Sequence, residues 1–198
     1  MAVVSYSVEV VNTNKKLRAI VADTMAIYNS ALNYVIGVVE ENYDQIKDLD
    51  NLERKMFIER LIHNTKSNVA KYDFDKKYYK LPSYMLRDIE AQAYGYYSSY
   101  VSNLANYEKE RYESISNGLK FQKRNPQKTT CNALPTFYKD NMYLEKKSNQ
   151  IELKLYVDNT WKFVKIKLKK RDLKHLELID GMEFKCHHGF FDKFTNKF

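Results

Sequence analysis

The stretch that decides the fold is KLPSYMLRDIEAQAYGYYSSYVSNLANYEKER, residues 80–111, where apolar side chains recur with the period of a helix. Pro82 suits the first turn of a helix because its missing N–H would have no partner there, and Ser83 can accept from the exposed amides at that end. The expected inward stripe runs for about seven turns. Its members are Met85, Leu86, Ile89, Ala93, Tyr97, Tyr100, Val101 and Leu104. We expect the helical part of the chain to close at Gly118.

The residues before this helix predict a strand followed by two more helices. VVSYSVEVV, residues 3–11, alternates with period two, which is typical of a half-buried strand. From about Lys16 to residue 46 the apolar period is that of a helix, and a shorter helix follows within LERKMFIERLIH, residues 52–63. Residues 64–80 are polar and mixed, so we expect a connection there.

The residues after Gly118 favour strands. KFQKRNPQKTT, residues 120–130, is basic and contains Pro126, which predicts an extended or loop segment. Residues 132–146 predict two short strands around a turn at Asp140 and Asn141. The clearest hairpin joins QIELKLYV, residues 150–157, through DNT to WKFVKIKLKK, residues 161–170. Its expected inward residues are Ile151, Leu153, Leu155, Val157, Val164, Ile166 and Leu168.

Composition limits the class of protein. A chain of 198 residues with 44% hydrophobic residues is long enough to bury a core as one large or two small domains. The two cysteines, Cys131 and Cys186, do not form a disulfide framework, which favours a reducing compartment. No apolar run approaches the roughly 18 residues that a membrane span needs. We therefore expect a cytoplasmic protein.

Positive charge is concentrated in the middle of the chain. Residues 114–171 hold 14 Lys and Arg against 4 Asp and Glu, a net charge of +10. This block would attract a polyanion with an affinity that falls as salt is added. On the second arm of the hairpin one face carries Trp161, Phe163, Lys165, Lys167 and Lys169, which suits tracking of a nucleic-acid backbone. An ordinary amphipathic hairpin with lysines in water explains the same pattern.

The sequence offers little catalytic chemistry. It has no Gly-rich phosphate loop, no GxSxG, no HExxH and no paired CxxC. CHHG, residues 186–189, contains zinc-ligand types, but adjacent residues in a regular element cannot all face one ion. We therefore expect no enzyme activity, no metal and no cofactor. The 17 tyrosines suit an interface or a wet groove, although for Tyr97 and Tyr100 packing between helices is the favoured explanation.

The order of these parts resembles a known family. A short strand, a helix with IYNSALNYVI, a helix opening LPSYMLRDIEAQAYGYYSSYVSNL, a glycine with basic FQKRNPQK, and a sheet with WKFVKIKL resemble the N-terminal half of TnpB. TnpB-like proteins are transposon-encoded, RNA-guided DNA nucleases, and compact type V CRISPR effectors are their relatives. The similarity covers roughly residues 1–171. We expect no counterpart of the family's RuvC nuclease domain in this sequence, because only 18 residues follow Asp180 of LELIDG.

The resemblance implies an α+β fold in which a helical lobe is inserted in a small antiparallel β-barrel or sheet. Residues 1–13 would give the first strand of a wedge-like sheet, 14–118 the recognition lobe, 119–171 the basic β-rich part, and 172–198 a tail of unknown role. The first strand would join the sheet formed after residue 119.

The resemblance also implies site residues. Ser83, Tyr84 and Arg87 match the start of the helix that, in the family, faces the short duplex motif beside the target. The basic stretch and the wedge strands hold guide RNA and heteroduplex in the family. The expected nucleic-acid-binding residues here are Lys120, Lys123, Arg124, Lys128, Trp161, Phe163, Lys165, Lys167, Lys169, Lys170 and Arg171.

Three functions remain open from sequence. The leading expectation is a non-catalytic protein that binds structured guide-like RNA and possibly duplex DNA. A variant is an inhibitor or regulator that competes for guide RNA or docks on a full-length RNA-guided nuclease, as an anti-CRISPR protein would. The third is a protein interaction module with no nucleic-acid role, in which the tyrosine-rich helix binds the partner.

Overall fold

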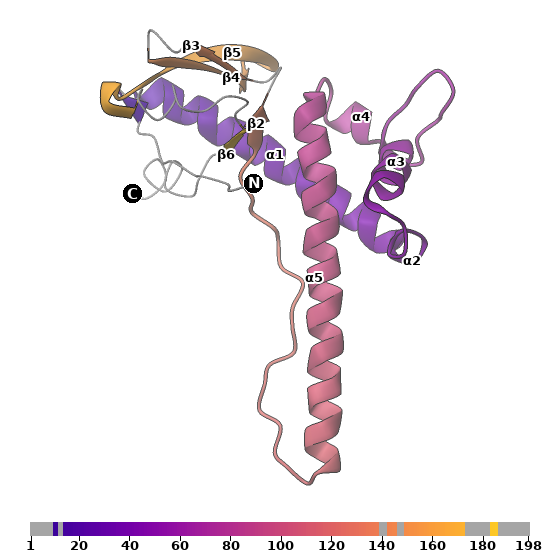
Figure 1. Cartoon of the computed structure of the whole chain (residues 1–198). Coiled ribbons are helices and arrows are strands. Elements are labelled where there is room, and N and C mark those ends of the chain that lie inside the picture. Colours follow the sequence, from indigo (N-terminus) through magenta and orange to yellow (C-terminus); the bar gives the residue numbers. More distant parts are fainter. Residues whose placement is uncertain (1–9, 12–13, 139–141, 146–148, 173–182, 186–198) are drawn as a thin grey trace. The chain divides into compact units, whose positions relative to one another are not determined.

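The computed structural model describes residues 10–11, 14–138, 142–145, 149–172 and 183–185 (Figure 1). They form an α+β fold, as expected from sequence. The helices are α1 (Lys15–Glu41), α2 (Tyr43–Ile46), α3 (Asn51–Ile62), α4 (Phe74–Lys77) and α5 (Ser83–Ser116). The strands are β1 (Val10–Val11), β2 (Thr136–Tyr138), β3 (Met142–Glu145), β4 (Gln150–Val157), β5 (Thr160–Leu168) and β6 (Glu183–Lys185), and a 3-10 turn, η2 (Lys170–Asp172), follows β5.

The chain divides into two compact units. We call residues 1–29, 78–88 and 133–198 the sheet unit, and residues 30–77 and 89–132 the helical unit. The helices α1 and α5 therefore each contribute residues to both units. Each unit is described by itself below.

The sheet unit is built on an antiparallel sheet with the strand order β1-β5-β4-β3. Its centre is the predicted hairpin, in which Val157 pairs with Thr160 and the loop is only Asp158 and Asn159. Both loop residues have positive φ, 50° and 57°, which is the backbone of a type I′ turn and is tolerated best by Gly, Asn and Asp. The hairpin prediction is confirmed, with a loop one residue shorter than the expected DNT.

The first strand joins this sheet as expected. Val10 pairs with Leu168 and Val11 with Lys167, so β1 lies antiparallel beside β5. Residues 3–9 of the predicted strand lie outside the described residues.

One face of the hairpin is buried. Its inward side chains are 1–3% exposed. They are Ile151, Leu153, Leu155, Ile166 and Leu168. Figure 1 shows the sheet along the first half of α1, and Thr24 of α1 accepts a hydrogen bond from the backbone N–H of Tyr156 at 2.9 Å. Burial of these apolar side chains stabilises the sheet unit.

The two short strands expected around residues 140–141 are present but have separate partners. β2 pairs with β6, whereas β3 pairs with β4. The predicted turn at Asp140 and Asn141 lies outside the described residues. Strands that are close in sequence therefore enter different sheets.

The helical unit contains the second half of α1, α2 to α4, and α5 from Ile89 onward. The expectation of one helix up to residue 46 is wrong, because α1 ends at Glu41 and α2 begins at Tyr43. Asn42 lies between them with φ −119° and ψ 15°, and its buried side-chain amide donates to the carbonyl of Val38 at 2.7 Å. An asparagine that bonds to the backbone in this way competes with continued helix.

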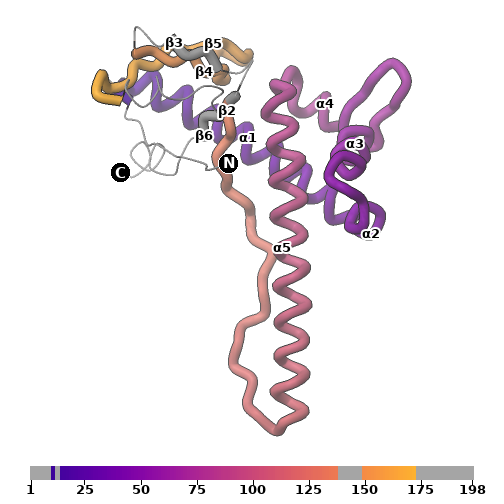
Figure 2. Tube along the Cα trace, viewed as in Figure 1, coloured from indigo at the N-terminus to yellow at the C-terminus, as the bar shows by residue number. Residues whose placement is uncertain are grey.

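A helix and an extended segment together form what we call the arm, residues 101–132. Figure 2 shows the residues after Gly118 running back along α5. The rings of Tyr107 and Phe121 meet edge-on at 5.1 Å, and Lys123 pairs with Glu110 at 2.5 Å. Residues 119–132 form neither helix nor strand, which confirms the predicted extended segment. None of the helices in the described part of the chain is long and apolar enough to cross a membrane.

Candidate nucleic-acid interface

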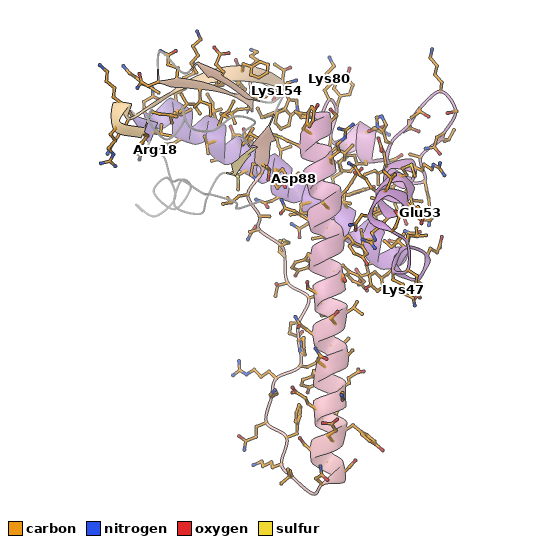
Figure 3. All side chains as sticks on the ribbon, in the orientation of Figure 1. Arg18, Lys47, Glu53, Lys80, Asp88 and Lys154 are labelled. Carbon is orange, nitrogen blue, oxygen red and sulfur yellow. The ribbon has the colours of Figure 1, made fainter. Side chains whose placement is uncertain are left out.

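The side of the hairpin opposite the buried face carries most of the predicted site on the sheet unit. We call it the outer face and define it by seven residues of β4 and β5. They are Glu152, Lys154, Tyr156, Trp161, Phe163, Lys165 and Lys167. The strand register places Trp161, Phe163 and the lysines on one face, as the alternation in the sequence predicts, and burial alternates with it from Val164 to Leu168. Figure 3 labels Lys154 on this sheet.

Three cross-strand pairs organise the outer face. Tyr156 and Trp161 are opposite each other, with ring centroids 5.5 Å apart at 66°. Lys154 is opposite Phe163, and its Nζ lies 5.7 Å from the ring centroid. Directly opposed side chains of this kind stabilise an antiparallel pair, and lysine above an aromatic ring adds a cation–π attraction.

The third pair is ionic and limits the charge of the outer face. Lys165 Nζ lies 3.4 Å from Glu152 Oε1, across the same pair of strands. The lysine side chain is 69% exposed, so the pair is weak and screened by salt. With three lysines and one glutamate, the seven residues carry a net charge of +2. This face is cationic, but less so than the lysine row alone indicates.

The remaining predicted residues at the end of β5 lie elsewhere. Lys169 directly follows β5 and is half-buried, while Lys170 and Arg171 are exposed in η2. Arg171 Nε lies 3.5 Å from Oδ1 of the buried Asp172. These residues extend the positive charge past the end of the strand but are not part of its alternating face.

The predicted basic stretch lies on the arm, in the helical unit. Lys120 and Arg124 are exposed, Lys123 pairs with Glu110, and Lys128 pairs with Glu40 of α1. The hydrogen bond to Glu40 raises the pKa of Lys128 above its ordinary value. Two of the four cations are thus engaged with carboxylates. The structure brings these four residues together on one segment, and Trp161, Phe163, Lys165 and Lys167 on another, in the other unit.

The residues expected to read a duplex motif lie at the start of α5, in the sheet unit. Pro82 directly precedes α5, and its carbonyl accepts the N–H of Leu86 at 3.0 Å. Ser83 and Arg87 are exposed and Tyr84 is half-buried. The Arg87 guanidinium lies over the Tyr84 ring, 5.3 Å from its centroid. These two side chains therefore lie side by side on the first two turns of α5.

Several tyrosines of α5 pack against other side chains of the helical unit. Tyr97 meets Tyr43 of α2 edge-on at 5.0 Å and Tyr100 at 6.0 Å. Burial raises the pKa of Tyr97, and the nearby Glu40 carboxylate adds to this rise. The Arg54 guanidinium covers Tyr94 at 3.6 Å and also donates to the carbonyls of α2 and its following turn. Packing between helices, the favoured explanation, is therefore supported for Tyr97, whereas the ring contact of Tyr100 is with Tyr97 on the same helix.

Two motifs quoted for the family resemblance are joined by one carboxylate in the sheet unit. Tyr28 of IYNSALNYVI donates its hydroxyl to Asp88 of LPSYMLRDIE at 2.6 Å, and the same oxygen accepts the N–H of Thr136 at 3.0 Å. Tyr28 is fully buried. Asp88, labelled in Figure 3, thus ties α1, α5 and β2 together.

In the helical unit, the side chain of Asn33 holds the end of the arm. The side-chain amide of Asn33 donates to the carbonyl of Cys131 at 2.8 Å and accepts its N–H at 2.9 Å. The Asn33 amide thereby pairs with both backbone polar groups of Cys131, as a neighbouring strand would. Burial raises the pKa of the Cys131 thiol, which favours its protonated form at neutral pH.

Sequence reasoning missed half of the outer face. Glu152, Lys154 and Tyr156 alternate with the inward residues of β4, so the same period-two argument that selected the residues of β5 identifies them too. Their opposition to Lys165, Phe163 and Trp161 follows from the two-residue turn.

Metal chemistry finds no support in the described residues, which contain no cluster of three His, Cys, Asp or Glu side chains able to hold an ion. CHHG, residues 186–189, lies outside them.

Comparison with known proteins gives one match. The model of the Aq_aa04 family matches residues 4–157. No curated protein and no solved structure matches the chain.

Proposed function

We propose that this chain, which belongs to the Aq_aa04 family, is a non-catalytic protein of the cytoplasm that binds structured RNA through the outer face and the arm. Its role would resemble that of the recognition half of a TnpB-like nuclease, in which base pairing reads sequence and the protein holds the backbone. Duplex DNA beside the RNA would meet the start of α5.

The observation that carries this proposal is the composition of the outer face. The outer face combines three half-buried or exposed aromatic rings with three lysines, which an ordinary amphipathic hairpin does not require together. Here Phe163 is 38% exposed, directly before Lys165 and Lys167 in the alternation of β5. Aromatic rings stack on bases while lysines neutralise phosphates, so one face offers both contacts that RNA uses.

The charge of the arm adds to this support. Its extended segment presents Lys120 and Arg124 to solvent, and Lys123 and Lys128 in ion pairs with glutamates that are 46% and 37% exposed. Exposed pairs of this kind are worth little, so phosphates can compete for the lysines. The uneven charge of residues 114–171, net +10, draws a polyanion toward both segments.

Salt-dependent RNA binding tests the proposal. The variant Lys165→Glu, Lys167→Glu, Lys169→Glu should weaken binding of a structured RNA strongly and flatten the dependence of log Kd on log salt by about 2. The matched control replaces three exposed lysines of the helical unit, Lys66, Lys71 and Lys76, with glutamate. It should change neither the RNA affinity nor its salt dependence by much.

Two outcomes of this test oppose the proposal. If the wild-type protein binds no RNA or DNA at about 50 mM salt, where electrostatic attraction is strong, the nucleic-acid role fails. If both triple variants weaken binding equally, binding reflects net charge and not the outer face.

A second function is favoured by the tip of the arm. Tyr112, Ile115 and Leu119 are 75%, 59% and 64% exposed within a few residues of each other. Exposed apolar side chains that are close together are typical of protein-binding surfaces. This patch suits a protein interaction module, or an inhibitor that docks on a full-length RNA-guided nuclease. Unchanged RNA binding together with loss of such docking in Ile115→Asp would assign the tip to a protein partner.

A further inference from the structure

The two cross-strand pairs of the outer face that lie nearest the hairpin turn differ from its other residues. They are the aromatic pair Tyr156 and Trp161 and the cation–π pair Lys154 and Phe163. We call these four residues the turn end. They are the second and fourth pairs from Asp158 and Asn159, whose positive φ angles fix a tight turn. The rings are therefore held on a rigid element.

The side chains of the turn end suit binding of a flat aromatic group such as a nucleobase. Phe163 is 38% exposed, and Trp161 and Tyr156 are half-buried, so each ring is partly accessible to solvent. Stacking of a nucleobase on an aromatic ring works for every base, because each has a π face. The ammonium of Lys154 lies over the same ring, 5.7 Å from the Phe163 centroid, and adds positive charge there.

Lys165 and Lys167, which follow Phe163 on β5, can bind the phosphates next to a base stacked on that ring. Along β5, Lys165 and Lys167 succeed Phe163 at alternate positions on the same face, each step about 6.8 Å. An extended single strand advances about one nucleotide over such a step. A base at Phe163 thus leaves the next phosphates near two ammonium groups, whereas the bases of a duplex are already stacked and cannot lie on the ring.

We propose that the turn end is a base-stacking site for a single-stranded polynucleotide, with one unpaired base against Phe163 and Trp161 and the following phosphates along Lys165 and Lys167. This inference rests on the proposed function and specifies which part of a nucleic acid the outer face takes. An unpaired loop or end of a folded RNA meets the requirement, and so does single-stranded DNA.

The alternative is that the aromatic pairs only stabilise the hairpin. Cross-strand aromatic and cation–π pairs do so in many sheets. The two explanations separate in Phe163→Leu, which keeps an apolar side chain and removes the π face. A purely structural Phe163 predicts a change in thermal stability and none in affinity.

The sequence provides a probe at this site, because Trp161 is its single tryptophan. Tryptophan fluorescence is measured during titration with an unstructured oligouridine, with the same oligomer in DNA, and with an oligomer of equal length made of abasic units. Anisotropy of an end-labelled copy reports total binding in parallel. We expect quenching by the first two and none by the abasic strand, which still binds through its phosphates. Stronger quenching by RNA would identify RNA as the ligand, and equal quenching would show that the site ignores the 2′-hydroxyl.

The variants complete the test. Phe163→Leu should weaken oligouridine binding about fivefold or more, and Lys154→Gln about twofold, with unchanged circular dichroism. The control Tyr79→Leu alters an exposed ring outside both the outer face and the arm and should leave affinity unchanged. Binding by anisotropy without quenching, or with equal affinity in Phe163→Leu, overturns the stacking site and spares RNA binding. Absence of any binding overturns the proposed function itself.

Discussion

Removing the one acidic residue of the outer face should tighten RNA binding. In Glu152→Gln the net charge of its seven residues rises from +2 to +3, and Lys165 loses the carboxylate that lies 3.4 Å from its Nζ. A surface shaped only for stability predicts a less stable variant with no gain in RNA affinity, because the variant loses a favourable pair. The change in RNA affinity therefore separates the two explanations.

The magnitude follows from Coulomb's law. A phosphate held by Lys165 would lie about 6 to 7 Å from the Glu152 carboxylate, and two unit charges at that distance repel by about 0.6 kcal/mol in water. Removing the repulsion should lower Kd about threefold and steepen the log–log salt dependence by up to about 0.7. The lost ion pair, 31% and 69% exposed, should cost about 0–1 kcal/mol of stability.

The assay is anisotropy of a labelled, structured RNA over a series of salt concentrations. The matched control is Asp44→Asn, which removes another carboxylate paired with a lysine, Lys47, at 2.8 Å in the helical unit. The reasoning is refuted if Glu152→Gln binds RNA no better than wild type while folding normally. It is also refuted if Asp44→Asn tightens binding as much.

Three predictions concern the fold. Asp88→Ala removes the acceptor of the buried Tyr28 hydroxyl and should lower the free energy of unfolding by about 2–4 kcal/mol in urea, with partial recovery in Asp88→Asn; a loss below about 0.5 kcal/mol would contradict this role. Asn159→Gly suits the positive φ of the hairpin turn and should raise the melting temperature through a gain of about 0.5 kcal/mol, whereas a decrease would argue against a type I′ turn. Arg54→Lys keeps the charge but loses the planar group over Tyr94 and its two carbonyl contacts, so it should cost about 1–2 kcal/mol; unchanged stability in urea would show that the stacking is incidental.

The parts of the fold that sequence predicts well are local. The hairpin of β4 and β5 follows from alternation on both arms and from Asp158-Asn159 between them, because turn chemistry and register are fixed within 20 residues. The exposure of Phe163 and the lysines follows from the same alternation. The long helix α5 is likewise predicted by its apolar period.

The parts that sequence does not predict depend on distant partners. β2 pairs with β6, which begins 45 residues after β2 ends. Nothing in TFY, the sequence of β2, indicates that β2 pairs with β6 and not with the neighbouring β3. The break at Asn42 depends on a side-chain bond to Val38 that a helical period does not reveal.

The candidate site shows the same limit. Lysine spacing predicts where cations are exposed, but not that Lys123, Lys128 and Lys165 meet glutamates 13, 88 and 13 residues away in the chain. Ion pairs between elements are a property of the folded chain. Net charge in a sequence block therefore overstates the charge that a partner encounters.

Ultraviolet cross-linking of the RNA that copurifies with the protein tests the central claim most directly. The RNA is sequenced, and the cross-linked peptides are identified by mass spectrometry. The account predicts cross-links on the outer face, at Tyr156, Trp161 or Phe163, with further attachment on residues 120–128 of the arm. Cross-links confined to residues 51–77, or a protein that carries no RNA at all, would contradict it.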